Sequence, residues 1–159
     1  MKTYYFTLSQ VFPLTHARAG QPTGFKEKVE AAIKQLEGEW WKLHTIRGNY
    51  ERWEKIFNEI YAGKACLSIR VWEGKPYRSK QIEIVRLTRE DGIGLQKLSF
   101  FLNRLKSPQV HIKENTVRCY TDRELANNDG LSLDDWQEWF KDYDLSHPLA
   151  IIHFTHFRY

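Results

Sequence analysis

The sequence predicts an α+β protein in which a mostly antiparallel, barrel-like sheet is flanked by helices. Strand-type and helix-type patterns alternate in the order strand, two helices, several strands, helix pair and strand. No repeat, low-complexity tract or linker divides the 159 residues, a length typical of one domain, so we expect a single domain over residues 1–159. Six Trp, eight Tyr and nine Phe supply enough apolar surface for a core and exclude a disordered chain.

The chain begins with a strand and a long loop. The short aromatic run at residues 3–8 is typical of a strand bounded by polar residues. Residues 9–22 follow without a periodic pattern, and long loops of this kind are functional or disordered. Because Phe12 and Leu14 are apolar and can anchor the segment, we expect an ordered loop.

Two helices are expected next. In each of them apolar residues recur three and four positions apart, as in a helix with one buried face. Thr23 has the side chain of an N-cap for the first helix and Gly38 can end it, whereas Asn49 and Gly63 serve the second helix. The apolar stripes are Phe25, Val29, Ala32, Ile33 and Leu36 in the first helix, and Tyr50, Trp53, Ile56, Phe57 and Ile60 in the second.

Strands dominate the middle of the chain. Residues 65–72 alternate apolar and polar side chains, which predicts one buried face. Residues 79–87 form a second strand beyond the turn-rich residues 73–76, Glu-Gly-Lys-Pro. Further strands are expected at residues 95–101, 117–120 and 149–159.

Two helix starts are marked in the last third of the chain. Thr121 and Glu124 have the spacing of a capping box, and Ser132 with Asp135 matches that spacing more loosely. Residues 127–130, Asn-Asn-Asp-Gly, form the loop between these helices. The second helix is expected to bury Leu133, Trp136, Trp139 and Phe140.

The charge pattern favours phosphate-bearing partners only weakly. The 24 basic residues exceed the 20 acidic ones by four, so the surface is mixed and its contacts with polyanions are salt-sensitive. Within residues 70–89, cations alternate with Trp72 and Tyr77, which suits a single strand of nucleic acid, although a solvated strand face above core aromatics is the alternative. Arg70 either holds a phosphate or pairs with Glu83 on the neighbouring strand.

Several classes of protein are excluded. No run approaches the ~20 apolar residues of a membrane span, and the N-terminus lacks the apolar segment of a secretory signal. Two cysteines are too few for a disulfide or zinc scaffold, so we expect a cytoplasmic protein with reduced thiols and no membrane partner. The histidines lack metal-ligand spacing, and no metal or other cofactor is expected.

The most unusual run is residues 42–47, Lys-Leu-His-Thr-Ile-Arg, between the first two helices. Side chains alternate in an extended chain, so Lys42 and Thr45 serve one site only if the backbone bends between them. His44 and Arg47 have the same spacing. A bent segment on which polar side chains converge is expected at the edge of a pocket.

Lys42-x-x-Thr45-Ile46-Arg47 resembles the signature of the ASCH superfamily, small β-barrels related to the PUA RNA-binding fold. The resemblance continues in order along nearly the whole chain and implies a small PUA-like, mostly antiparallel β-barrel flanked by helices. It also implies a pocket for RNA or a modified nucleoside. The further matching segments are residues 12–25, 67–79, 128–132, 139–140 and 151–155.

The resemblance implies chemistry for three residues. One bacterial branch of the family hydrolyses the acetyl amide of N4-acetylcytidine with a Lys, a Thr and a Glu, which by motif fall on Lys42, Thr45 and, with the shorter Asp replacing Glu, on Asp129. A Thr hydroxyl attacks an amide when a base removes its proton, and Lys42 is such a base where burial lowers its pKa. The structural alternative is a solvated Lys42, an ordinary strand Thr45 and an Asp129 that caps the following helix.

We therefore expect a protein that binds RNA or a modified nucleoside, with an N4-acetylcytidine amidohydrolase and a ribonuclease as enzymatic alternatives. An interaction protein without a small ligand is the fourth possibility, and a monomer is favoured. The cleft is expected to hold Lys42, Thr45, Arg47, Arg70 and Asp129, with Thr23, Ser68, His44, Trp72 and Tyr77 as further ligand-binding candidates.

Overall fold

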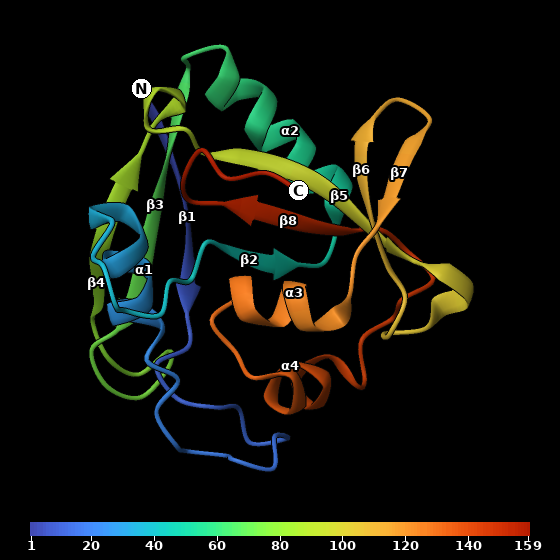
Figure 1. Ribbon diagram of the computed structural model, residues 1–159. Helices are drawn as coiled ribbons and strands as arrows, with labels where there is room; N and C mark the ends of the chain where they lie inside the picture. The colour runs from blue at the N-terminus through green and yellow to red at the C-terminus, as the bar shows by residue number, and fades with distance from the viewer.

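Two β-sheets and four α-helices make up the computed structural model, which describes residues 1–159 (Figure 1). The first sheet has the strand order β1 (Lys2–Leu8), β3 (Ala65–Trp72) and β4 (Gln81–Leu87). The second has the order β2 (His44–Arg47), β8 (Leu149–His153), β5 (Gly94–Phe100), β6 (Pro108–Lys113) and β7 (Thr116–Cys119). The helices are α1 (Phe25–Lys34), α2 (Tyr50–Tyr61), α3 (Asp122–Asn128) and α4 (Leu133–Phe140).

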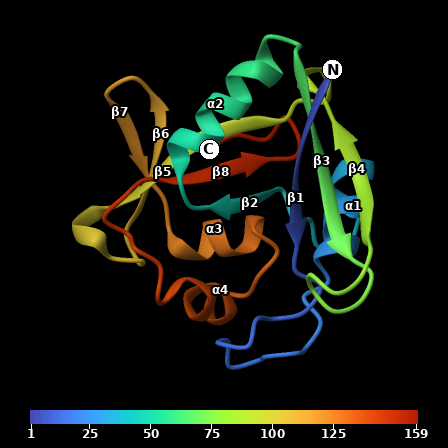
Figure 2. The same cartoon turned by 180° about the vertical axis from the view of Figure 1, so that it is seen from behind.

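The pairing of the strands confirms the predicted α+β class with mostly antiparallel sheets. Strand β1 runs parallel to β3, and every other strand pair is antiparallel. The ladders form two sheets without a closed barrel among them. In both views α3 and α4 lie beyond the edge strand β2, on the side away from β8 (Figures 1 and 2).

One hydrophobic core of 29 buried residues joins the two sheets. Phe6 of β1 stacks on Phe154, just after β8, with ring centroids 6.2 Å apart. The same Phe6 meets the edge of Trp53 of α2 at 5.9 Å. The two sheets and α2 therefore bury their apolar faces against one another, as amphipathic elements must. No helix is both long and apolar enough to cross a bilayer.

The predicted helix caps are largely confirmed. The Asn49 side chain accepts a hydrogen bond from the Arg52 backbone, and Thr121 forms the full capping box with Glu124. Thr23, however, is not an N-cap: Gly24 holds that position at φ 70°. Helix α1 also ends at Lys34 rather than continuing to Leu36, because Gln35 turns the backbone into the left-handed region.

Every predicted strand except the one at residues 65–72 differs from the observed strand at one or both ends, and two strands, β2 and β6, were missed. Strand β4 begins at Gln81, β5 covers Gly94–Phe100, and β8 ends at His153 instead of continuing to Tyr159. Strand β6 escaped prediction because only two of its residues, Val110 and Ile112, carry its apolar alternation.

The loop at residues 9–22 is ordered, but only one of its two expected anchors is buried. Phe12 is 3% exposed, whereas Leu14 is 94% exposed, so the prediction for Leu14 was wrong. A second buried contact replaces it: the His16 ring lies 3.0 Å from the Asp135 carbonyl of α4, and the Arg18 guanidinium pairs with the Asp135 carboxylate. The loop is thereby held against α4.

Candidate functional site

A cavity of about 340 Å³ lies where β1, β2, the start of α1 and the α3–α4 segment meet. It is lined by four of the five predicted cleft residues, Lys42, Thr45, Arg47 and Asp129. Its volume falls at the lower end of the range of ligand pockets, ~300–1,000 Å³. The other lining residues are Leu8, Ser9, Pro13, Thr15, Phe25, Ile46, Leu131, Trp139, Phe140 and Tyr143.

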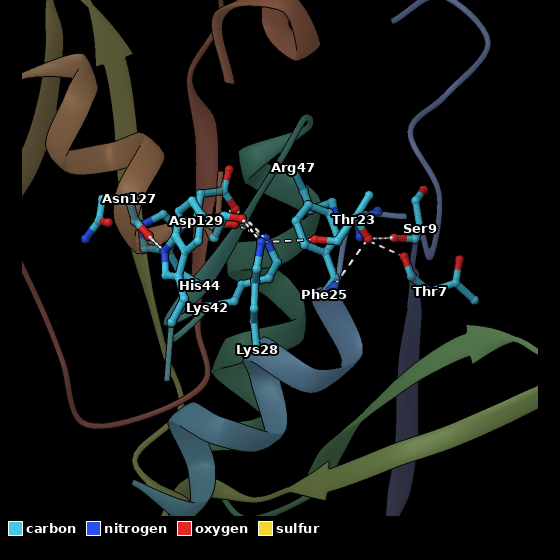
Figure 3. Close-up of polar contacts among 12 residues, drawn as sticks. Thr7, Ser9, Thr23, Phe25, Lys28, Lys42, His44, Arg47, Asn127 and Asp129 are labelled. Carbon is cyan, nitrogen blue, oxygen red and sulfur yellow. Dashed lines mark hydrogen bonds and ion pairs between the residues drawn. The ribbon is translucent and has the colours of Figure 1, made fainter. Parts of the chain in front are cut away.

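Lys42 and Asp129 form a buried ion pair in the wall of this cavity (Figure 3). The Lys42 ammonium lies 2.5 Å from the Asp129 carboxylate and 2.7 Å from the Asp129 backbone carbonyl. It also lies 4.0 Å from the centroid of the Phe25 ring. The two residues are 1% and 3% exposed, so the alternative of a solvated Lys42 is wrong.

Local backbone contacts bring the two residues together. Lys42 stands in the irregular segment before β2, where its N–H donates to the Lys28 carbonyl of α1 at 3.0 Å. The next N–H, of Leu43, donates to the Asn128 carbonyl at 2.8 Å. Asp129 is the C-cap of α3, so it ends the preceding helix and does not cap the following one. These bonds fasten the approach to β2 between α1 and α3.

Gly130 permits this close approach. Its φ of +76° lies in the left-handed region, and a Cβ there would stand 3.1 Å from Lys42 Cβ and 3.3 Å from Lys28 Cδ. The Lys28 ammonium donates to the Gly130 carbonyl at 2.8 Å and to the Thr23 carbonyl at 3.0 Å. Figure 3 shows Lys28 rising from α1 toward the ion pair. A side chain at position 130 would therefore displace one of the two lysines.

Thr45 offers a free hydroxyl to the cavity. It lies on β2 opposite Ile152 of β8, and its hydroxyl forms no hydrogen bond within the protein. Because β2 begins only at His44, Lys42 is not held to the alternation of the strand. Both side chains consequently line one cavity, as the expected bend in residues 42–47 requires.

Arg47 connects the cavity wall to the other sheet. Its guanidinium donates to the Thr7 carbonyl of β1 at 2.7 Å and lies 4.8 Å from the Phe6 ring centroid. Its Nε is buried without a partner. Burial lowers the pKa of Arg47 from its usual value, yet the guanidinium stays charged because that value is so high.

His44 lies behind the ion pair rather than on the cavity wall. Its Nε2 is 2.7 Å from the Tyr159 hydroxyl, which also accepts a hydrogen bond from the Asn128 amide at 3.1 Å. Because this hydroxyl already accepts one hydrogen bond, we expect it to donate its proton to Nε2, which leaves the ring proton on Nδ1. Nδ1 lies 3.9 Å from the Asp129 carboxylate and has no hydrogen-bond partner. Sequence reasoning missed Tyr159, since no local pattern connects residues 115 positions apart.

Burial shifts the proton balance of the ion pair. It lowers the pKa of Lys42 and raises the pKa of Asp129, and the attraction between the two charges opposes both shifts. Burial also lowers the pKa of His44 well below its usual value, so this ring is neutral. Transfer of the proton from Lys42 to Asp129 thus costs less free energy than between the same groups in water.

Arg70 and Ser68 lie elsewhere, so their predicted place in this cleft was wrong. Both belong to β3, where Arg70 Nε donates to the Ser68 hydroxyl at 2.9 Å and a second Arg70 nitrogen donates to Gln81 at 3.3 Å. The Ser68 hydroxyl in turn donates to Glu83. Glu83 forms its salt bridge with Arg86 at 3.0 Å rather than with Arg70. These side chains satisfy one another on a sheet face away from the cavity.

The remaining candidates fall outside the cavity wall. Thr23 is buried, where its hydroxyl donates to the Ser9 carbonyl at 2.7 Å and accepts from the Phe25 N–H at 3.2 Å. Trp72 and Tyr77 pack together with ring centroids 5.2 Å apart, beside a second hollow. No group of three or more His, Cys, Asp or Glu side chains is arranged to hold a metal ion.

Comparisons with known proteins assign no family. No protein-family model and no solved structure matches the chain. A stretch of 63 residues, 40% of this chain, is 35% identical to DNA polymerase IV 2 of Halalkalibacterium halodurans, of which it covers 15%. The chain therefore spans a small part of that polymerase, and a likeness of this extent carries no function across.

Proposed function

We propose that the protein binds a modified nucleoside, or the RNA residue that carries it, in the cavity beside β2. The observation that carries the proposal is the polar edge formed by Lys42, Asp129 and Thr45 in a wall of which half the lining residues are aromatic or aliphatic. A nucleobase has a flat apolar face and one hydrogen-bonding edge. Pockets for such ligands combine apolar walls with a few placed polar groups.

The aromatic side of the cavity suits a planar ring. Phe25 and Trp139 lie 5.6 Å apart at an angle of 43°, and Phe140 and Tyr143 continue the wall from the end of α4. Offset and edge-on contacts between aromatic rings are favourable at such separations. The cavity volume of about 340 Å³ accommodates one nucleoside better than a longer segment.

The charge in the cavity favours an uncharged ligand over a phosphate. The Lys42 ammonium is already balanced by Asp129, and the Arg47 guanidinium is committed in part to the Thr7 carbonyl. A ribonuclease needs free positive charge at the phosphorus in its transition state. The ribonuclease alternative therefore has less support than nucleoside binding.

The free hydroxyl of Thr45 favours a second candidate function, hydrolysis of the acetyl amide of N4-acetylcytidine. A neutral Lys42, its proton held by Asp129, takes the hydroxyl proton as Thr45 Oγ1 bonds to the acetyl carbon. The C–N bond breaks, and Lys42 passes the proton to the leaving amine of cytidine. Water then cleaves the acetyl ester to acetate and restores Thr45. The raised pKa of Asp129 supports its part in this step.

Calorimetric titration with N4-acetylcytidine and cytidine tests the binding, and chromatography of the same mixtures detects released cytidine. Asp129→Asn keeps the shape of the side chain but removes the charge that holds Lys42, so we expect at least tenfold weaker binding and no hydrolysis. Asp142→Asn, at an exposed position, is the matched control. Absence of binding in the wild type, or full binding in Asp129→Asn, argues for an interaction protein without a small ligand. Cleavage of a labelled single-stranded RNA favours the ribonuclease instead.

The proposal includes the finer structural and cellular expectations. We also propose that the chain belongs to the ASCH superfamily and that the two sheets form a PUA-like barrel. In this proposal the protein is a monomer with a single domain. A cytoplasmic location is also part of it, supported by Cys66 and Cys119, which form no disulfide.

A further inference from the structure

We propose that a groove next to the cavity binds the nucleotide adjacent to the one in the cavity, so that the natural ligand is a single-stranded RNA segment rather than a free nucleoside. This inference rests on the proposed function and deepens it by naming the ligand class. The groove comprises the loop after β1 and the hairpin between β3 and β4. These two segments lie side by side in both views (Figures 1 and 2).

The groove adjoins the cavity. It encloses about 680 Å³, and three of its lining residues, Leu8, Ser9 and Pro13, also line the nucleoside cavity. The two segments that form the groove are fastened together, because the Gln10 amide donates to the Trp72 carbonyl at 2.7 Å. A strand leaving the cavity over the shared rim at Ser9 and Pro13 enters this groove directly.

The groove presents exposed apolar side chains to its opening. Tyr77 is 88% exposed and Leu14 is 94% exposed, one from each wall. Tyr77 also has a φ of +63°, a region that a residue with a bulky side chain rarely adopts. Its ring is held 5.2 Å from that of Trp72. Two aromatic rings at the edge of a groove form a platform on which a base can stack.

The charge of the groove differs from that of the cavity. Lys75 and Arg78 line it, both are exposed, and neither forms a salt bridge. None of the 15 lining residues is acidic. Free cations beside stacking rings match the phosphates and bases of a single strand, whereas the paired Lys42 inside the cavity does not attract phosphate. In this proposal the cavity binds the modified nucleoside, and the groove binds the adjacent nucleotide through its phosphate and base.

The test compares two probes on the full chain. The first is N4-acetylcytidine, and the second is a five-nucleotide RNA with acetylated cytidine at its centre. We expect the RNA to bind at least tenfold more tightly than the nucleoside, with an affinity that falls as salt rises. A five-nucleotide DNA and a short RNA duplex of the same sequence show whether the 2′-hydroxyl and the single-stranded form matter.

Two variants address the groove without touching the cavity. Tyr77→Asn removes the ring at a position where Asn tolerates positive φ, and Lys75→Gln with Arg78→Gln removes the two charges. Each is expected to weaken binding of the RNA about five- to tenfold and to leave binding of the nucleoside unchanged. The controls are Phe101→Ser, at an exposed aromatic residue outside both hollows, and Lys55→Gln with Lys64→Gln, which make the same change in net charge.

The outcomes separate this inference from the proposed function. If the nucleoside binds but the RNA binds no more tightly, or the groove variants behave like their controls, the groove does not bind RNA. The proposal that the cavity binds the nucleoside is then still supported. If neither probe binds, the proposed function fails and the groove assignment fails with it. If the RNA binds and the groove variants alone weaken it, the inference is supported.

Discussion

The ammonium group of Lys42 and the carboxylate of Asp129, 87 residues apart in the sequence, are 2.5 Å apart, and both residues are almost fully buried. The same ammonium also donates a hydrogen bond to the backbone carbonyl of Asp129, at 2.7 Å. One residue at the end of α3 therefore supplies both acceptors for the cation. The pair joins the approach to β2 to α3 and at the same time forms part of the cavity wall.

Breaking the pair is expected to cost far more than breaking an ion pair at the surface. Lys42→Met leaves a buried carboxylate without its cation, so we expect a loss of about 3 kcal/mol in the free energy of unfolding. Lys141 pairs with Glu138 at the same 2.5 Å but at the surface, and Lys141→Met should leave the free energy of unfolding nearly unchanged. Urea denaturation measures both changes. If both variants lose the same free energy of unfolding, the buried pair does not stabilise the protein more than a surface pair does.

Acid is expected to destabilise the protein through its buried histidines. Burial, together with the charge of Arg158, lowers the pKa of His153 from 6.5 to about 3. The unfolded chain protonates this ring near pH 6.5 while the folded protein does not, so stability falls as pH drops from 6.5 toward 3 and is fully present above 6.5. Each such histidine contributes a slope of about 1.4 kcal/mol per pH unit well below pH 6.5. His44 adds a slope of the same sign.

The variant His153→Phe checks that assignment. It should reduce the pH dependence of the free energy of unfolding between pH 6 and 5 by about 1.4 kcal/mol per unit. The wild-type protein, measured over the same pH range, is the reference. An unaltered slope in His153→Phe would mean that this ring is charged in the folded protein.

Gly130 should resist substitution more than a glycine with the same backbone conformation in open space. Gly130→Ala places a methyl group 3.1 Å from Lys42 Cβ, whereas Gly20→Ala, at φ +79°, meets nothing within 4 Å. The positive φ alone costs about 1 kcal/mol in each variant. We expect roughly a further 1–2 kcal/mol for Gly130→Ala from crowding. Thermal denaturation of the two variants tests this, and equal shifts in Tm contradict a packing role for Gly130.

Tyr159→Phe should release His44 from its fixed orientation. The variant removes the hydroxyl that links His44 to Asn128, at an expected cost of about 1–3 kcal/mol. In the wild type, long-range ¹H–¹⁵N NMR spectra should show the neutral His44 ring with its proton on Nδ1. Tyr5→Phe, whose hydroxyl makes no hydrogen bond, is the control. A proton on Nε2 in the wild type would show that the phenol does not donate to the ring.

Much of the architecture was predictable because its signals are local. Asn49 and Thr121 mark helix starts through hydrogen bonds within three residues of themselves, and both caps form. Strand β3 was predictable with its observed ends, since its alternation runs over eight residues. Strand β6 was not predictable, because its apolar pattern is too short to identify a strand. Its pairing with β5 and β7 is seen only in the folded structure.

The site residues likewise include some that local sequence predicts and some that it does not. The spacing of Lys42 and Thr45 indicated a bend, and the structure places both in one cavity. Arg70 was assigned to the cleft from its residue type, but its position on β3 depends on sheet packing that the sequence does not display. The partner of His44 lies at Tyr159, the last residue, and only the folded chain brings them together.

Thr45→Val separates the chemistry of the site from its stability. Valine has nearly the shape of threonine, and the hydroxyl it removes has no partner in the protein, so the free energy of unfolding should change by less than about 0.5 kcal/mol. Binding of N4-acetylcytidine should weaken about tenfold, and its hydrolysis should stop. Thr116→Val, on the exposed strand β7, is the matched control. Loss of folding in Thr45→Val would contradict a free hydroxyl.

An NMR titration of ¹⁵N-labelled protein with N4-acetylcytidine tests the nucleoside cavity most directly. The cavity predicts shifts of backbone amide signals that cluster on its lining residues, Ser9, Thr45, Arg47 and Leu131, and that are smaller in Thr45→Val at the same ligand concentration. A titration without shifts, or with shifts confined to residues outside the cavity such as the β6–β7 hairpin, would contradict it.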